Sequence, residues 1–105
     1  MKKQAMLEKA AQIVGRSGVY FDESSAGGEG IRVDELSRCN FNPLDDLHDA
    51  MWLLIAAEVD LKFEDGCVGA KKNGFWYYEQ AQPNNYQWHK TVCLAIVRAA
   101  VEDDQ

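Results

Sequence analysis

Residues 59–80 carry the pattern that most restricts the fold of this 105-residue chain. Apolar and polar side chains alternate from Val59 to Glu64, which is the period of a half-buried β-strand. Two short pairs, Asp65-Gly66 and Asn73-Gly74, follow at the spacing of hairpin turns, and both pairs tolerate the positive φ angles that such turns need. The pattern predicts a three-stranded antiparallel meander with strands over residues 59–64, 67–72 and 75–80.

The two turns also decide which side chains share a face of this sheet. With Glu64 opposite Cys67 and Lys72 opposite Phe75, one face carries Val59, Leu61, Phe63, Val68, Ala70, Phe75 and Tyr77. The other face carries Asp60, Lys62, Cys67, Gly69, Lys71, Trp76, Tyr78 and Gln80. On this second face we expect Asp60, Lys71 and Trp76 to form one cross-strand row. Lys62, Gly69 and Tyr78 are expected to form the next row.

Three segments with helical periodicity flank the meander, over residues 2–14, 43–58 and 86–101. The second has the clearest start, because Asn42 is a preferred N-cap, Pro43 suits the first helical position and Asp45 stands where a capping box has an acid. Its predicted buried stripe consists of Leu44, Leu47, Met51, Leu54 and Ile55. The last helix is predicted to turn inward Val92, Cys93, Ile96, Val97 and Ala100.

These elements predict one α+β domain. Its parts are an N-terminal helix (1–16), an acidic Gly-rich irregular segment (17–41), a helix–meander–helix core (42–101) and an acidic tail (102–105), with room for a short extra strand near 19–21 or 31–33. We expect helices 43–58 and 86–101 on the apolar sheet face and the N-terminal helix over Trp76 and Tyr78, an αβα-like sandwich. Because Asp60, Lys62 and Glu64 make that second face polar, a two-layer domain with an open sheet face is the alternative.

Three stretches carry a family resemblance: Phe41 before Asn42-Pro43, the Val-Asp-Leu-Lys-Phe run at 59–63, and the Ala-rich run with one Arg at 93–100. In this order they resemble the phage ABA sandwich family, small proteins of bacteriophages and prophages named for their α-β-α layering. The resemblance spans residues 39–101. It implies a phage or prophage origin and the sandwich fold, and it brings no catalytic residues with it.

The net charge, the apolar runs and the cysteines of the chain indicate which partners and which cellular location to expect. The formal net charge of −6 argues against general binding to DNA or anionic lipid, because Lys and Arg carry such binding. No stretch approaches the roughly 20 apolar residues of a membrane span, and residues 1–11 lack the apolar core of a signal peptide. Three scattered cysteines, Cys39, Cys67 and Cys93, indicate free thiols. We expect a protein of the host bacterial cytoplasm, with its oligomeric state left open.

Carboxylates crowd one part of the chain and suggest a protein-binding surface. These residues are Asp22, Glu23, Glu29, Asp34, Glu35, Asp45, Asp46 and Asp49. Complementary charge speeds encounter and sets specificity, so the partner would be a host or phage protein with a basic surface. The hypothesis is an inhibitor of a host defence protein, for example of the CRISPR type. The simpler interpretation is a solvated loop followed by an ordinary helix start.

An alternative hypothesis uses the second sheet face. Trp76 and Tyr78, flanked by Lys62 and Lys71, have the composition of a surface that stacks a base or nucleotide. The structural interpretation is that both aromatics only cover the sheet. A further alternative is an accessory role in virion structure or assembly.

The sequence indicates neither catalysis nor a bound cofactor. Asp45, Asp46 and Asp49 with His48 resemble a metal cluster, but negative charge at a helix N-terminus explains these acids sufficiently. His89 and Cys93 stand four residues apart, but Cys93 belongs to the apolar stripe, where a reactive thiolate is disfavoured. The prediction is a non-enzymatic binding protein without a metal.

Overall fold

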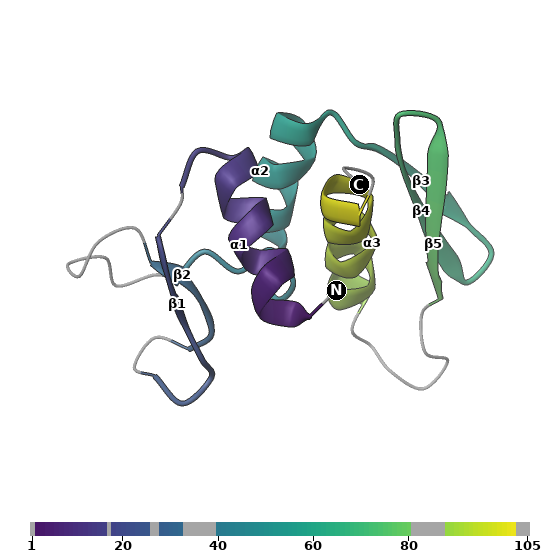
Figure 1. Ribbon diagram of the computed structural model, residues 1–105. Coiled ribbons are helices and arrows are strands. Elements are labelled where there is room, and N and C mark those ends of the chain that lie inside the picture. Colours follow the sequence, from purple (N-terminus) through teal and green to yellow (C-terminus); the bar gives the residue numbers. More distant parts are fainter. Residues whose placement is uncertain (1, 17, 26–27, 33–39, 81–87, 103–105) are drawn as a thin grey trace.

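The computed structural model of the chain describes residues 2–16, 18–25, 28–32, 40–80 and 88–102. These residues form an α+β fold of three helices and two antiparallel sheets (Figure 1). In chain order the elements are α1 (Lys3–Ile13), β1 (Val19–Phe21), β2 (Gly30–Arg32), α2 (Leu47–Ala57), β3 (Asp60–Glu64), β4 (Cys67–Lys72), β5 (Phe75–Gln80) and α3 (Trp88–Glu102).

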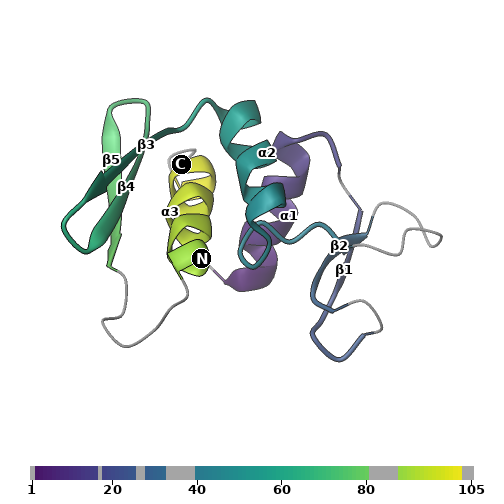
Figure 2. The same cartoon turned by 180° about the vertical axis from the view of Figure 1, so that it is seen from behind.

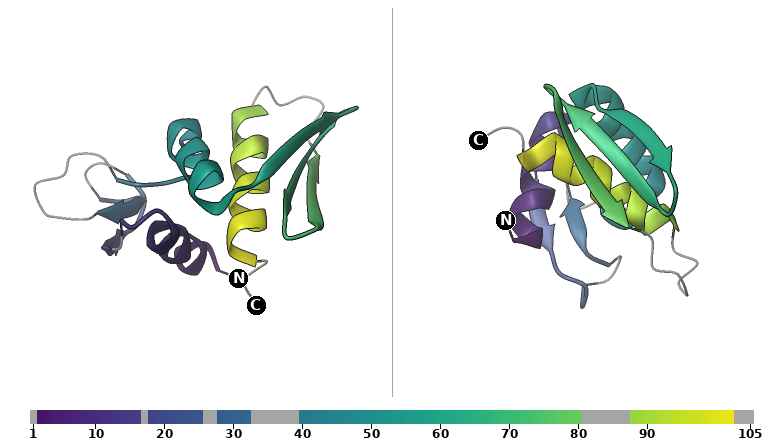
Figure 3. Two further views of the ribbon diagram at one scale, coloured as in Figure 1. Left: turned by 90° about the horizontal axis from the view of Figure 1, so that it is seen from above. Right: turned by 90° about the vertical axis from the view of Figure 1, so that its right-hand side faces the viewer.

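The helices lie between the two sheets, with β1 and β2 at one end of the molecule and the meander β3-β4-β5 at the other (Figure 1, Figure 2). Helix α3 packs on β4 and β5, whereas α1 and α2 pack on α3 from the side away from the meander. Seen from above, α3 therefore separates the meander from the other two helices (Figure 3). This order differs from the predicted sandwich, in which helices cover both faces of one sheet.

Two of the predicted helix positions are wrong. Helix α1 contacts α2, α3, β1 and β2 and does not lie over Trp76 and Tyr78. Helix α2 packs mainly on α3 and not on the apolar sheet face. The polar side of the meander can face solvent and does not need a helix to cover it. The apolar side chains of α1, such as Leu7, instead pack among the other helices and β2. Of the two-layer alternative, only the open sheet face matches the structure, because a second sheet lies on the other side of the helices.

The meander itself has the predicted strands and register. Asp60 pairs with Lys71, Lys71 pairs with Trp76, and Gly69 lies between Lys62 and Tyr78. Asn73 and Gly74 both have positive φ, 54° and 90°, as a type I′ hairpin turn requires. In the other turn Gly66 has a φ of 72° and Asp65 is not in this region. Local turn chemistry therefore fixes the register of this sheet.

The second sheet arises where the sequence allowed one short strand. β1 and β2 pair with each other, Tyr20 opposite Ile31, and form a sheet separate from the meander. Phe41 extends this pairing through two hydrogen bonds with Ile31, of 2.8 and 2.9 Å. Gly30 is required here, because a Cβ at this position would lie 2.7 Å from the Phe41 carbonyl oxygen and its φ is 153°. This bridge brings Asn42 beside the hairpin.

Helix α2 begins later than predicted. Its N-cap is Asp46, whose side chain accepts a hydrogen bond from the His48 backbone N–H at 2.9 Å. Asn42 caps the preceding turn instead: its Oδ1 accepts from Leu44 N at 3.1 Å. The backbone carbonyl of Asn42 accepts from both Asp45 N and Asp46 N, which closes the turn and delays the helix.

The stripe predicted to be buried was correct only in part, because Leu44 and Leu54 pack half-buried against the core while its other three members are exposed. The buried residues of α2 are Asp49, Ala50, Leu53 and Ala57. Leu47 and Met51 are each 39% exposed, and Ile55 is 71% exposed. Small buried side chains on α2 and on the Ala-rich α3 allow the two helices to approach closely, so the small-residue side of α2 faces its partner. The larger side chains of Leu47, Met51 and Ile55 then point outward.

One core joins the helices to both sheets. Its fully buried large side chains include Leu7, Ile31, Leu53, Ile96 and Val68. The five inward residues predicted for α3 are all buried. At the edges of the core, Arg98 of α3 pairs with Glu79 of β5. Among the described residues, no helix has the length and apolar character that crossing a membrane requires.

Candidate binding surfaces

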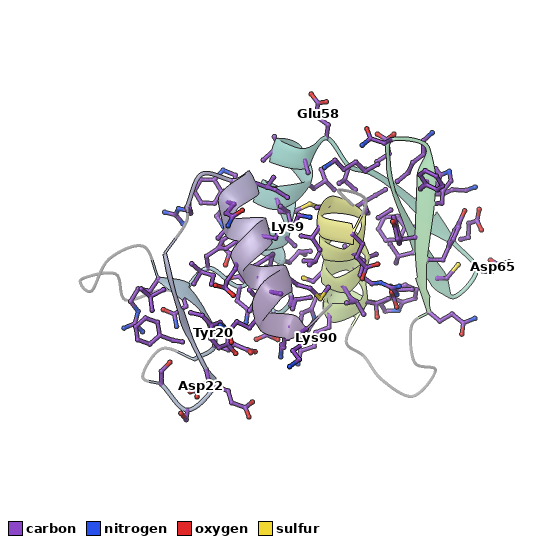
Figure 4. The ribbon with its side chains drawn as sticks, viewed as in Figure 1. Lys9, Tyr20, Asp22, Glu58, Asp65 and Lys90 are labelled. Atoms are coloured by element: carbon purple, nitrogen blue, oxygen red, sulfur yellow. The ribbon has the colours of Figure 1, made fainter. Side chains whose placement is uncertain are left out.

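A cleft of about 820 Å³ opens where α1, the β1–β2 hairpin, the turn before α2 and the first turns of α3 meet. Its floor contains the apolar side chains of Met6, Leu44 and Leu94. Its polar lining consists of Lys3, Glu23, Glu29, Asn40, Asn42, Asp45, Asp46 and Lys90. In Figure 4, Lys90, which lines the cleft, and the hairpin residues Tyr20 and Asp22 are labelled in the lower part of the molecule. The cleft thus combines an apolar floor with a rim rich in carboxylates.

Glu29 organises the wall of this cleft. It accepts a hydrogen bond from the Tyr20 hydroxyl at 2.5 Å and pairs with Lys3 Nζ at 2.7 Å. Burial alone would raise the pKa of Glu29, but the hydrogen bonds from Lys3 and Tyr20 outweigh burial and lower it. The hydrogen bond between Tyr20 and Glu29 raises the pKa of Tyr20 to about 12. Glu29 is therefore held as a carboxylate between the hairpin and α1.

The carboxylates of the cleft make the electrostatic potential at Lys3 negative. The pKa of Lys3 is raised, first by its hydrogen bond to Glu29 and further by the charges of Glu29, Glu23 and Asp45. Lys90 lies 3.3 Å from Asp45, and both side chains are about half exposed (48% and 63%). Four carboxylates, those of Glu23, Glu29, Asp45 and Asp46, thus share the cleft with two lysines.

The structure divides the eight predicted acidic residues among different roles. Glu23, Glu29, Asp45 and Asp46 come together at the cleft. Asp22 instead closes its own turn, accepting from Ser24 N and Oγ, and these bonds lower its pKa. Asp49 is buried, and its Oδ2 accepts from the backbone N–H of Asn42 at 3.0 Å. It does not belong to the surface. Asp34 and Glu35 lie outside the described residues.

Sequence reasoning missed most of the remaining cleft residues. Lys3, Met6, Asn40, Lys90 and Leu94 come from segments far apart in the chain. Their meeting depends on α1 and α3 packing together and on the Ile31–Phe41 bridge. No local pattern in the sequence signals these contacts. Asn42 was predicted only as a helix cap, although its side chain also donates to the Glu29 carbonyl oxygen.

The outer face of the meander, meaning the face that points away from α3, carries the predicted aromatic and cationic residues together. Trp76 and Tyr78 stack with ring centroids 6.0 Å apart and planes 28° apart. Lys62 Nζ and Lys71 Nζ each lie 5.5 Å from the centre of the Trp76 ring. Lys62 also pairs with Glu64 at 2.5 Å. Unlike the acidic residues, all four members of this set occupy one continuous surface.

Cys93, His89 and His48 were the residues considered for nucleophilic or metal chemistry, and their surroundings do not favour either role. Cys93 is a buried free thiol whose pKa is raised to about 11 by burial, with a contribution from the charges of Asp46, Asp45 and Asp49. A thiol in this state is a poor nucleophile at neutral pH. His89 is exposed at the start of α3. The His48 ring lies beside the Trp52 ring. The Arg16 guanidinium carbon lies 4.5 Å from the centre of that Trp52 ring.

Cys67 is a half-buried free thiol, and Cys39 lies outside the described residues. Within the part of the chain that the structure describes, no three His, Cys, Asp or Glu side chains gather in a way that would hold a metal ion.

Comparison with models of protein families, with curated proteins and with solved structures finds no significant match to this chain. The resemblance to the phage ABA sandwich family stays a prediction. The geometry of the two surfaces is therefore the basis on which a function can be proposed.

Proposed function

We propose that this is a non-enzymatic binding protein that receives a basic segment of another protein in its acidic cleft. The observation that carries the proposal is the meeting of Glu23 and Glu29 from the hairpin with Asp45 and Asp46 from the turn before α2. These carboxylates belong to separate segments, yet they line one concave surface. Subtracting the two lysines from the four carboxylates leaves a formal charge of −2 in the cleft.

The lining matches the chemistry of an arginine or lysine side chain. Such side chains bury an aliphatic stem on apolar surface while the charged head stays near solvent or a carboxylate. Met6, Leu44 and Leu94 would contact the stem. Asp45 would accept from the charged head, because its present pair with Lys90 is exposed and such pairs contribute little. Arginine suits the site best, since its planar fork can hydrogen bond a carboxylate through two N–H groups.

A protein with this property can block a nucleic-acid-binding protein. The Lys and Arg residues that hold phosphates are the basic groups for which a carboxylate-lined cleft has complementary charge. With the predicted phage origin, we propose inhibition of a host defence protein, such as a CRISPR-type nuclease, as the biological role. The inhibitor would compete with the nucleic acid for those basic residues.

The test compares two double variants of equal charge. Glu23→Lys with Asp45→Lys reverses two exposed carboxylates of the cleft. Glu8→Lys with Asp65→Lys makes the same change in net charge at exposed positions outside the cleft. Asp65 lies at the far tip of the meander in Figure 4. The probe is a synthetic peptide with three arginines separated by alanines, titrated by calorimetry.

At low salt we expect the cleft variant to bind the peptide about tenfold more weakly than the wild type, and the control variant to stay within about twofold. Between about 0.1 M and about 1 M salt, where the Debye length falls from about 10 to about 3 Å, wild-type affinity should fall more steeply than that of the cleft variant. Equal weakening in both double variants would mean that only net charge matters, and the proposal would be rejected.

A further inference from the structure

We infer that the outer face of the meander is a second binding site and that its ligand is a free nucleotide. In this site the base would stack on Trp76 and Tyr78, and the phosphate would lie at Lys62 and Lys71. The inference does not depend on the acidic cleft, since none of these four residues lines it.

The face is open in the described structure. Helix α3 occupies the opposite side of the sheet, and in the right-hand view of Figure 3 the meander lies in front of the helices with its outer face toward the viewer. Trp76 is 37% exposed and Tyr78 is 46% exposed. Large aromatic side chains that remain exposed together on a sheet are available for contact with a flat ring.

Gly69 allows the two rings to lie low on the sheet. It sits in the central strand between Lys62 and Tyr78, where glycine weakens a sheet and commonly marks a close approach. A Cβ at this position would lie 2.8 Å from Tyr78 Cε1 and 3.1 Å from Trp76 Cε3. Both rings therefore extend over the place where a side chain would otherwise stand. The result is a continuous aromatic platform across two neighbouring rows of the sheet.

The lysines supply positive charge beside this platform. Lys62 comes from β3 and Lys71 from β4, and both ammonium groups lie near the Trp76 ring. They are flexible, so they can swing from the ring to a phosphate while the base takes their place on the aromatic face. A nucleotide presents both required parts, a flat ring and an anionic group, at a separation set by one sugar.

Charge favours a free nucleotide over a nucleic acid strand. On the outer face Lys62 and Lys71 balance Asp60 and Glu64, so this surface is neutral although the chain carries a formal charge of −6. One phosphate group can be held by the two lysines. A strand would extend its further phosphates over the rest of an acidic protein, where the repulsion rises with each added phosphate.

The experiment titrates adenosine 5′-monophosphate into the full chain, with affinity from calorimetry and the binding position from amide chemical shifts. We expect the shifts to centre on residues 69, 76 and 78. Trp76→Ala should weaken binding at least about fivefold, the lower end of what loss of one stacking partner causes. Phe75→Ala is the matched control, because Phe75 directly precedes Trp76 in β5, is 66% exposed and points to the opposite face.

Gly69→Ala gives a second variant that keeps every ligand-contacting side chain. Its added methyl group must displace the Tyr78 and Trp76 rings, which are free to move outward, so folding should survive while nucleotide affinity falls. Adenosine should bind more weakly than the monophosphate, since it has no anionic group to contact Lys62 and Lys71. Circular dichroism of each variant confirms that the fold is retained.

Three results would overturn the inference. The first is the absence of shifts at residues 69, 76 and 78 at millimolar nucleotide. The second is an equal effect of Trp76→Ala and Phe75→Ala, which would leave Trp76 a purely structural cover for Gly69. The third is an affinity for an eight-residue single-stranded oligonucleotide more than about a hundredfold above that for the mononucleotide, because this gain would identify a strand-binding surface.

Discussion

Asp49 illustrates how one side chain can leave a predicted surface and become part of the folded core. It is 9% exposed, and it accepts the backbone N–H of Asn42, a donor that the preceding turn leaves without another partner in the described structure. Burial raises its pKa, and the hydrogen bond from Asn42 opposes that shift only in part. The sequence predicted Asp49 in the first turn of a helix or just beyond, and it lies in the first turn of α2, but the side of the helix that is buried depends on α3.

Removing the acceptor at position 49 should destabilise the protein. Asp49→Ala leaves the buried Asn42 N–H unpaired, which costs about 1–3 kcal/mol. Asp49→Asn keeps an oxygen acceptor of the same shape and should cost much less. Urea unfolding at neutral pH measures both free energies. Equal losses in the two variants would show that the hydrogen bond contributes nothing.

The pH dependence of Asp49→Asn provides an independent check. Because the folded pKa of Asp49 is raised, the folded state binds this proton more tightly than the unfolded chain. The stability contribution of Asp49 is therefore full below the ordinary Asp pKa of about 3.9 and is lost as pH rises through the higher folded value. We expect the free energy of unfolding of Asp49→Asn, relative to wild type, to rise over that interval. Asp65→Asn, at an exposed position, is the control. If the free energy of unfolding of Asp49→Asn fell relative to the wild type over this interval, a raised pKa of Asp49 would be contradicted.

At the scale of elements, the sequence predictions succeed where local residues determine the structure and fail where contacts between distant segments determine it. The meander was predictable with its register, because Asn73-Gly74 and Asp65-Gly66 are local signals and alternation sorts the side chains. The start of α2 and its buried face were not. Both Asn42 and Asp46 are good caps, and which one begins the helix depends on a turn held by the Asn42 carbonyl oxygen.

Two substitutions within α2 test which of its sides is buried. Leu53 is fully buried, so Leu53→Ala should cost about 2–5 kcal/mol of unfolding free energy. Ile55 is 71% exposed, so Ile55→Ala should stay within about 0.5 kcal/mol of wild type. Denaturant unfolding measures both values. The periodicity of the sequence alone predicts a large loss at Ile55, and such a loss would contradict the observed orientation of the helix.

At the scale of the whole molecule, the decisive feature is the separation of the two sheets by a layer of helices. The acidic cleft forms on the side of α3 that faces α1 and the β1–β2 hairpin, whereas the aromatic platform lies on the outer face of the meander. Figure 1 shows the hairpin and the meander on opposite sides of α3. Helix α3 and the full thickness of the sheet stand between the cleft and the platform. The sequence predicted the aromatic platform because one sheet contains it. It could not predict the cleft, which exists only when α1, α3 and the hairpin have packed.

This separation predicts that the two surfaces bind independently. Mutations at distant sites without shared partners usually add within about 0.3–0.5 kcal/mol, and their charges are screened beyond a Debye length of about 10 Å at 0.1 M salt. The variant Glu23→Lys with Asp45→Lys should therefore bind the nucleotide within about twofold of wild type. Trp76→Ala should likewise retain affinity for the arginine peptide, as calorimetry can measure. Linkage requires that saturating peptide change the nucleotide affinity of the wild type by the same factor as saturating nucleotide changes its peptide affinity. A tenfold change in both affinities would show that α3 transmits a change from the cleft to the sheet and would contradict independent binding. A tenfold effect of one variant on the distant ligand, with no coupling between the two ligands on the wild type, would instead reveal damage to that variant's fold.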